Sequence, residues 1–472
     1  MISALGVAYS ITNTGLGILL AIGTAVYFGG PPSYFWGFLL MTIVGFCAAV
    51  SLGELVSMYP HSGGQYFWVA QLYPAENGRR LLSYITAIFA WAGAVATGAS
   101  ACLVCTQIIF GMATLANPGL TIQPWQIFLG FQALNLACFP VNCVERGLGY
   151  FGKLALIMAI SSTIVIFIAV LAVAPTKQSA AFFFTDFTNV SGWPTGLAFF
   201  IGINAPNWNF SCLDAATHLA DELPDPRRNI PRVLVLTVLV GFITGLPVLM
   251  AMYFCVQSVD DAINGVSGIF SMEVFLQVFT GNKAAALGLE ALVLIPGIFS
   301  IVGIHTWQSR MAWALSRDGG FPSSKYLARV ASAPFGSPVY AHAWSASWTA
   351  MCGFLYLAST TAFSSLISAG IVLQYLSYSL AVGCLLLRGR SNVRPGPFFM
   401  PKLGLVCNVV VLIWTVAATV FYSLPYFMPV KAAEMNYVSV VLVFIVLYAF
   451  VYWFAVGRRA YVVPPREEDW ER

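Results

Sequence analysis

Long apolar segments recur from one end of the chain to the other, and they constrain the fold more than any other feature. A helix needs about 20 residues to cross the hydrocarbon core of a membrane. The segments long enough to do so, read between charged residues and Pro or Gly breaks, cover residues 4–28, 33–59, 81–115, 124–143, 154–174, 195–219, 232–257, 284–313, 341–358, 362–387, 401–424 and 436–456. The sequence therefore predicts an all-α membrane protein with twelve transmembrane helices.

Composition excludes several other classes of protein. Only 8% of the 472 residues are charged, whereas soluble domains carry about 25%. The chain therefore has too few charged residues to cover a water-facing surface, which excludes a soluble enzyme and a disordered chain. The net charge of +4 is small and scattered, so we expect no nucleic acid partner. The expected partners are the lipid bilayer and a small-molecule substrate.

The basic residues give the predicted helices a direction. With the N-terminus placed in the cytosol, the outer segments contain only three of the 22 Lys and Arg residues, namely Lys177, Lys283 and Lys431. Cytosolic loops of membrane proteins carry the excess of Lys and Arg. We therefore expect both termini in the cytosol and a location in the plasma membrane. The first apolar run follows Met1 almost at once, which predicts no cleaved signal peptide.

Two of the predicted helices contain clusters of helix-breaking residues near their middles. The first helix has Ser-Ile-Thr-Asn-Thr-Gly-Leu-Gly over residues 10–17, and the sixth has Gly-Ile-Asn-Ala-Pro-Asn-Trp-Asn over residues 202–209. Unwound backbone is tolerated in a membrane only where it lines a cavity or is buried in protein. Breaks at matching places, five helices apart, indicate an inverted-repeat transporter with a site near the bilayer midplane. The structural alternative is that both clusters only kink their helices.

Three sequence motifs are similar to those of a known family. They are Gly53–Tyr66 at the end of the second helix, Asp214–Pro231 with its acidic pair and proline-rich loop, and Ser309–Pro322 after the eighth helix. They resemble the amino acid–polyamine–organocation (APC) superfamily, and within it the fungal amino acid, GABA and choline permeases. The resemblance implies a five-plus-five inverted-repeat core over residues 1–387, two further helices over 388–456 and a cytosolic tail over 457–472. Members usually carry a longer leader, so a missing N-terminal segment is expected.

The broken helices supply the candidate substrate-binding residues. Half-helix ends carry partial charges, so a substrate carboxylate would suit the amides of Thr12, Asn13, Thr14 and Gly15. An ammonium group would suit the sixth helix around Gly202, Asn204 and Asn207. A quaternary ammonium such as choline needs aromatic faces instead. The candidates for this cage are Trp91, Trp208, Tyr375 and Tyr378, with ordinary core or lipid packing as the alternative.

Charged residues within or beside the spans are candidates for gating and coupling, because intramembrane charges are costly and usually functional. Glu54 and Asp214 are expected to pair with loop arginines such as Arg310 or Arg317, Glu222 is expected to pair with Arg317, and Glu290 could handle a proton or cation. The family resemblance implies proton coupling, with Lys153 as the candidate lysine. Sodium coupling is the alternative, and it would require the hydroxyls of Ser300 and Thr306.

Neither a metal nor a cofactor is expected. The four histidines share no helical spacing, and the Cys102–Cys105 pair stands in an apolar run without a second pair. No clustered catalytic residues are visible, so the chain is not expected to be an enzyme. The predicted function is a secondary active permease for a small amino acid or choline-type solute that works by alternating access. The alternatives are a GABA or polyamine permease and a nutrient sensor on the same scaffold.

Overall fold

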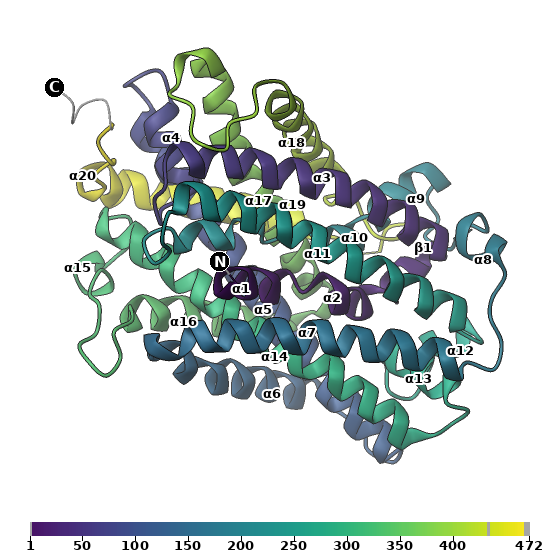
Figure 1. The fold of residues 1–472 in the computed structure, drawn as a ribbon. Coiled ribbons are helices and arrows are strands. Elements are labelled where there is room, and N and C mark those ends of the chain that lie inside the picture. The colour runs from purple at the N-terminus through teal and green to yellow at the C-terminus, as the bar shows by residue number, and fades with distance from the viewer. Residues whose placement is uncertain (1, 432–434, 467–472) are drawn as a thin grey trace.

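The computed structural model describes residues 2–431 and 435–466, which fold into one bundle of helices (Figure 1). The end of the predicted tail, residues 467–472, lies outside the described residues. The spans are formed by α1 (Ile2–Thr12) with α2 (Thr14–Ala21), α3 (Gly30–Met58), α5 (Arg79–Ala116), α6 (Pro124–Cys138), α7 (Glu145–Val173), α9 (Thr195–Gly202) with α10 (Asn204–Trp208), α11 (Pro226–Cys255), α14 (Lys283–Arg317), α16 (Val339–Ala358), α17 (Thr360–Arg388), α18 (Pro401–Phe421) and α19 (Val438–Tyr452).

These helices form the twelve spans that the apolar segments predict. Within the described part of the chain, nine spans are long and apolar enough to cross a membrane on those criteria alone. The other three are α6, α16 and the interrupted pair α9–α10. Helices α16 and α17 are separated only by Ser359, whose side chain accepts a hydrogen bond from the amide of Ala362 and thereby caps α17.

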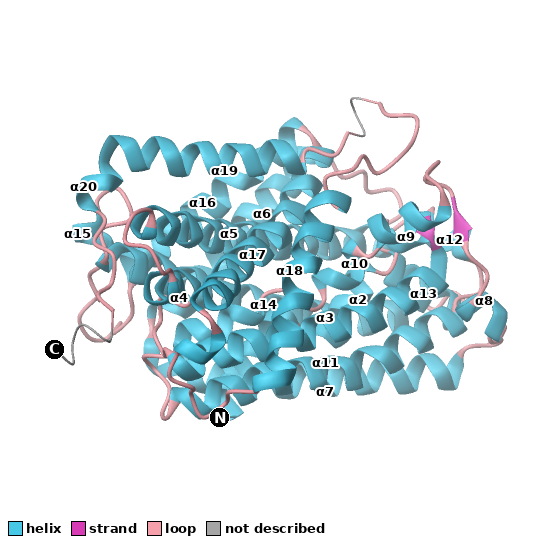
Figure 2. Ribbon diagram, turned by 90° about the horizontal axis from the view of Figure 1, so that it is seen from above, coloured by secondary structure: helices cyan, strands magenta, loops and turns pink. Residues whose placement is uncertain are grey.

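Short elements connect the spans at the two ends of the bundle. They are η1 (Thr24–Tyr27), α4 (Gln65–Leu72), η2 (Phe139–Cys143), α8 (Ala180–Phe184), η3 (Leu213–Leu219), α12 (Val259–Ile263), α13 (Phe270–Val278), α15 (Ser324–Leu327), η4 (Arg390–Asn392), η6 (Trp453–Gly457) and α20 (Arg458–Ala460). Strands β1 (Phe28–Gly29) and β2 (Thr188–Asn189) form an antiparallel pair. Figure 2 shows α4, α15 and α20 at one end of the bundle, and α8, α12 and the strands at the other.

The first span is interrupted at a single residue. Asn13 adopts a left-handed conformation, with φ 40° and ψ 44°, which asparagine tolerates better than most residues. Its carbonyl accepts hydrogen bonds from the amides of Leu16 (3.1 Å) and Gly17 (2.7 Å). The break therefore interrupts the helix while leaving those two amides paired.

The sixth span is interrupted at Ile203, inside the predicted cluster of residues 202–209, and again after Trp208. Pro206 lies within α10, in the first turn, where its missing amide costs no hydrogen bond. The chain leaves the helical conformation after Trp208 and stays irregular until η3 begins at Leu213. Cys212 is left-handed, with φ 64°. Its amide donates to Oε1 of Gln374 on α17 at 2.8 Å, so a tertiary contact supports the irregular segment.

Small residues allow the two broken spans to pack closely inside the bundle. Helices α1 and α2 lie in the middle of the molecule in Figure 1 and contact α7, α11 and α14. Gly6 of α1 lies directly against the carbonyl of Gly152 on α7, where a Cβ atom would be only 2.1 Å from that oxygen. Close approach through glycine is a common way to pack membrane helices, since there is no hydrophobic force between them.

The described end of the chain, residues 458–466, folds back across the bundle. Arg79 donates to the carbonyl of Pro464 at 2.7 Å, and Arg466 donates to the carbonyl of Tyr73 at 2.8 Å. The amide of Val462 donates to the carbonyl of Asp318 at 2.9 Å. This C-terminal segment therefore joins the loop before α5 to the end of α14.

Candidate functional site: two cavities at the interrupted helices

A cavity of about 410 Å³ opens between the broken spans and α17, and we call it the outer cavity. It lies toward the end of the bundle that carries β1 and β2, which we call the open end. The outer cavity is lined by Leu20, Ala21, Thr24, Tyr27, Phe28, Ser100, Val104, Ile201, Gly202, Asn204, Ala205, Trp208, Thr360, Thr361, Ser364, Ile367, Ser368, Ile371, Tyr426 and Phe427. All of these residues are described, and none of them is charged. Its wall thus offers aromatic rings, hydroxyls and an amide.

A second space of about 30 Å³ lies at the breaks themselves, and we call it the inner chamber. It is lined by Ile11, Thr12, Asn13, Gly17, Leu20, Thr97, Ala101, Cys105, Trp208, Ser211, Cys212, Gly297, Ser300 and Ile304. Leu20 and Trp208 line both spaces, so these two side chains form the wall between them. Oδ1 of the buried Asn13 has no protein partner among the described residues, and a substrate donor in the chamber would satisfy it.

The structure brings only some of the predicted substrate residues to these spaces. Thr12, Asn13 and Trp208 line the chamber, and Gly202, Asn204 and Trp208 line the outer cavity. Gly15 instead packs against side chains of α7 and α11. Thr14 turns its hydroxyl to the carbonyl of Asn209 at 2.8 Å, which ties the two broken spans together.

The other predicted residues of the aromatic cage lie outside both cavities. Trp91 is buried among aromatic rings and donates to Oγ of Ser345 at 3.1 Å. Tyr375 donates to Oδ1 of Asn207 at 3.2 Å, and Asn207 donates to the hydroxyl of Tyr422 at 2.8 Å. Asn207 and Tyr375 therefore join α10 to α17 and α18, and the cage of four aromatic residues does not form in this structure.

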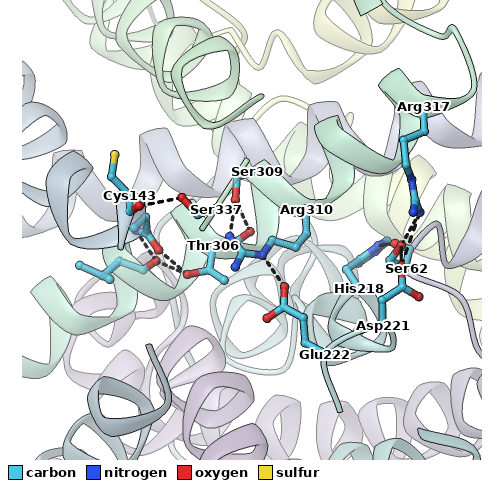
Figure 3. A network of polar contacts seen from close by, with 12 residues as sticks. Ser62, Cys143, His218, Asp221, Glu222, Thr306, Ser309, Arg310, Arg317 and Ser337 are labelled. Carbon is cyan, nitrogen blue, oxygen red and sulfur yellow. Dashed lines mark hydrogen bonds and ion pairs between the residues drawn. The ribbon is translucent and has the colours of Figure 1, made fainter. Parts of the chain in front are cut away.

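The opposite end of the bundle, which we call the closed end, is sealed by polar contacts (Figure 3). Nε of Arg310 donates to Oε1 of Glu222 at 2.8 Å. Nη2 of Arg317 donates to Oγ of Ser62 at 2.9 Å and lies 3.5 Å from Oδ2 of Asp221, which accepts from Ser62 at 2.6 Å. The predicted pairing of Glu222 with Arg317 is thus wrong, because Arg317 lies beside the preceding acidic residue, Asp221.

Among the described residues, Asp214 does not pair with a loop arginine as predicted, whereas Glu54 does, although with neither Arg310 nor Arg317. Asp214 is fully buried and accepts from Gln65 at 2.8 Å and from Tyr378 at 2.5 Å, with Nε2 of His218 3.4 Å away. These partners lie nearer in the fold than any loop arginine. Glu54 is fully buried as well, and it accepts two hydrogen bonds of 2.8 Å from a different arginine, Arg390.

Two titratable residues of the closed end have shifted pKa values. Burial raises the pKa of Asp318 to about 6, although hydrogen bonding by Tyr66 (2.9 Å) and the charge of Arg317 lower it. Burial lowers the pKa of His61 to about 4, which keeps its ring neutral at physiological pH. In agreement, Nδ1 of His61 accepts a hydrogen bond from the amide of Gly63 at 2.8 Å.

The residues predicted to couple transport to protons or sodium lie in separate parts of the fold. Glu290 of α14 is fully buried, and Ser271 of α13 donates to it at 3.2 Å. Lys153 is exposed on α7, with Nζ 5.6 Å from the ring centre of Tyr150. The hydroxyl of Ser300 contacts the carbonyl of Ser10 at the first break. Thr306, the other candidate, donates to Oδ1 of Asn142 instead.

Several residues of the site escaped the sequence analysis. Ser62, Gln65, Asp221 and Arg390 were not singled out, although the first three stand within or beside the family-like motifs. Tyr27, Phe28, Tyr426 and Phe427 carry no signal that separates them from the other aromatic residues of this chain. Their place on the outer cavity depends on contacts between segments about 400 residues apart.

Two broken helices beside an uncharged cavity, open toward one end and sealed at the other, define a multi-pass membrane transporter. The chain belongs to the amino acid permease family, which matches residues 1–450. It is 46% identical to the transmembrane transporter swnT of Metarhizium robertsii over 98% of this chain and 92% of that protein. It is 44% identical to the swainsonine transporter swnT of Arthroderma benhamiae over 98% and 91%, and 38% identical to the choline transporter of Saccharomyces cerevisiae over 97% and 81%. The family consists of permeases and not of enzymes.

Proposed function

We propose that this permease carries a small ammonium-bearing solute of the choline type, by proton-coupled alternating access. The observation that carries the proposal is the chemistry of the outer cavity, in which Trp208, Tyr27 and Phe427 stand beside hydroxyl groups and no charged side chain. A quaternary ammonium donates no N–H hydrogen bonds, so aromatic faces are its best partners in a protein. The hydroxyls of Ser100 and Ser368 suit the hydroxyl of choline.

The relatives support the same substrate class. One is a choline transporter and another is a swainsonine transporter. A free amino acid would add a carboxylate, for which the outer cavity supplies no cationic side chain. Burying an anion without a partner is costly. We therefore infer that the outer cavity favours a cation over a zwitterion.

The proposed topology assigns the closed end to the cytosol. The positive-inside distribution of Lys and Arg supports this orientation, with both termini cytosolic in the plasma membrane. The structure would then represent the outward-facing state of the transport cycle. Glu290 is the candidate proton carrier, because it is a fully buried carboxyl group inside a span and accepts a hydrogen bond from the hydroxyl of Ser271.

Uptake in a host that lacks its own choline transporters tests the proposal. We expect labelled choline to accumulate, and unlabelled choline to compete better than GABA, polyamines or any proteinogenic amino acid. Swainsonine belongs in the same competition panel, because two relatives share the swnT name. A protonophore should reduce the initial rate, whereas replacing sodium should not.

The variant Trp208→Ala tests the site in the same assay, because it removes one of the two side chains that separate the outer cavity from the inner chamber. It should reach the cell surface but lose most of its uptake. Preferential transport of an amino acid would contradict the choline-type substrate, and sodium dependence would contradict proton coupling. Binding without uptake would support the alternative function of a nutrient sensor.

A further inference from the structure

The loop after α18 forms part of the outer cavity, although the family resemblance places the last two spans outside the transport core. Tyr426 and Phe427 of this loop line the cavity together with the ends of α2 and α17. The loop is fixed against the chain before α9 by two hydrogen bonds. The amide of Met428 donates to the carbonyl of Ser191 at 2.8 Å, and Nε1 of Trp193 donates to the carbonyl of Pro425 at 2.9 Å.

Four aromatic rings meet where this loop crosses the outer end of the first span. The ring of Phe427 stacks on Phe28 with the centroids 5.7 Å apart, and it meets the edge of Tyr27 at 5.9 Å. The ring of Tyr426 lies 6.5 Å from that of Phe28. We call these four residues the aromatic rim. All four also line the cavity, so their rings can reach a solute inside it.

The rim is connected to the broken sixth span through hydroxyl and amide groups. The hydroxyl of Tyr426 lies 3.1 Å from Oγ of Ser368 on α17, which accepts a hydrogen bond of 2.7 Å from Nδ2 of Asn204 on α10. Oδ1 of Asn204 has no protein partner among the described residues. Because Asn204 lines the cavity, this oxygen can accept a hydrogen bond from the hydroxyl of a bound solute.

We propose that the aromatic rim is an access site, which binds the cationic head of the substrate before it reaches Trp208, and that Tyr426 and Phe427 therefore contribute to specificity. The proposal rests on the proposed function and extends it to a segment outside the expected core. A permanent cation gains energy from aromatic faces that a neutral solute of the same shape does not gain. The rim would therefore distinguish choline from its uncharged isostere, 3,3-dimethylbutan-1-ol.

The test compares choline uptake by the unaltered protein and by Phe427→Leu, which keeps an apolar side chain but removes the ring. We expect KM for choline to rise about 3- to 30-fold, the range given by cation–π contacts in proteins. Competition by 3,3-dimethylbutan-1-ol should change less than twofold. The preference for the cation over the neutral isostere should therefore fall, while the amount at the cell surface stays constant.

A matched control lies six residues earlier in the chain. Phe421 stacks on Phe200 at 4.7 Å but does not line the cavity, so Phe421→Leu should retain the original KM and preference. If Phe427→Leu fails to reach the surface, Tyr426→Leu provides the same comparison. It should raise the KM for choline in the same way, with Phe421→Leu again as the control.

The outcomes separate this inference from the proposed function. If the unaltered protein takes up choline but the ring-removing variants keep its KM and its preference, the access site is wrong while the proposed function stands. If the unaltered protein takes up no choline, the proposed function is overturned and the access site falls with it.

Discussion

Individual residues set the local geometry of this permease, and Asn13 is the clearest case. Its left-handed conformation divides α1 from α2, and its carbonyl accepts two of the amides that follow. An asparagine inside an otherwise apolar span is a visible signal, so this position could be predicted. The side-chain Oδ1 of Asn13 remains available in the inner chamber.

At the same scale, Asp318 should make stability depend on pH. Its pKa of about 6 lies above the ordinary value of 3.8, so the folded protein holds this proton more tightly than the unfolded chain. The resulting stabilisation is complete below about pH 4 and is lost as the pH rises through about 6. Asp318→Asn stays neutral and should remove this dependence.

Thermal unfolding of the purified protein at pH 4.5 and 7.5 measures the effect. At pH 7.5, Asp318→Asn should have a higher melting temperature, relative to the unaltered protein, than it has at pH 4.5. Tyr66→Phe, which removes the donor but keeps Asp318 titratable, serves as the control and should retain the dependence. If the melting temperatures of Asp318→Asn and the unaltered protein change equally with pH, the expected role of Asp318 is contradicted.

The residues that could not be predicted are those whose role depends on partners far away in sequence. Trp91 and Tyr375 look as suitable for a cation site as Trp208, since all are aromatic residues in apolar spans. Only the fold shows that Trp91 packs beside Phe321 and that Tyr375 bonds Asn207. Residue type thus indicated the chemistry of the site but not which side chains reach it.

At the scale of elements, one ion pair holds α3 to the chain that leads into α18. Glu54 accepts from both Nη atoms of Arg390 and from the amide of Met400, all at 2.8 Å. The carboxylate is fully buried and the arginine side chain is 11% exposed. A buried charge that loses its partner is strongly destabilising, by about 3–5 kcal/mol.

Arg390→Gln should therefore lower the free energy of unfolding by an amount in that range. The double variant Glu54→Gln/Arg390→Gln should recover part of the loss, because it leaves no unpaired charge. Thermal or denaturant unfolding in detergent, analysed as a double-mutant cycle, gives the coupling between the two residues. If Arg390→Gln is as stable as the unaltered protein, the buried carboxylate of Glu54 does not need Arg390 as its partner.

The helices were easier to predict than the breaks within them. Apolar length is a property of one segment, so the twelve spans follow from the sequence alone. The irregular segment before η3 is different, because the amide of Cys212 is held by Gln374, 162 residues away. The interruption at Ile203 falls inside the predicted cluster, whereas Pro206 itself fits the first turn of α10.

At the scale of the whole molecule, the cavities and the closed end describe one state of a transport cycle. The Arg310–Glu222 pair should favour this state. Glu222→Gln removes one charge of the pair, and since Glu222 is 37% exposed the effect should be moderate. We expect the inner chamber to become accessible from the closed end about 2- to 5-fold more often.

Cys212 is a native reporter of this opening, because it is buried and lines the inner chamber. A membrane-impermeant maleimide, applied to vesicles with the closed end outward, should label it faster in Glu222→Gln. Cys212→Ser gives the background from other cysteines, and Asp260→Asn controls for the loss of an acidic residue at the open end. Equal labelling rates in Glu222→Gln and the unaltered protein would exclude a gating role for the pair.

The contrast in size between the two cavities has a mechanical consequence. A space of about 30 Å³ holds little more than a water molecule or two, so an organic solute that passes Trp208 has to displace the atoms packed around the chamber. The free energy needed for that displacement is taken from the attraction between solute and protein. The net affinity for a solute in the chamber is therefore lower than its contacts alone would give.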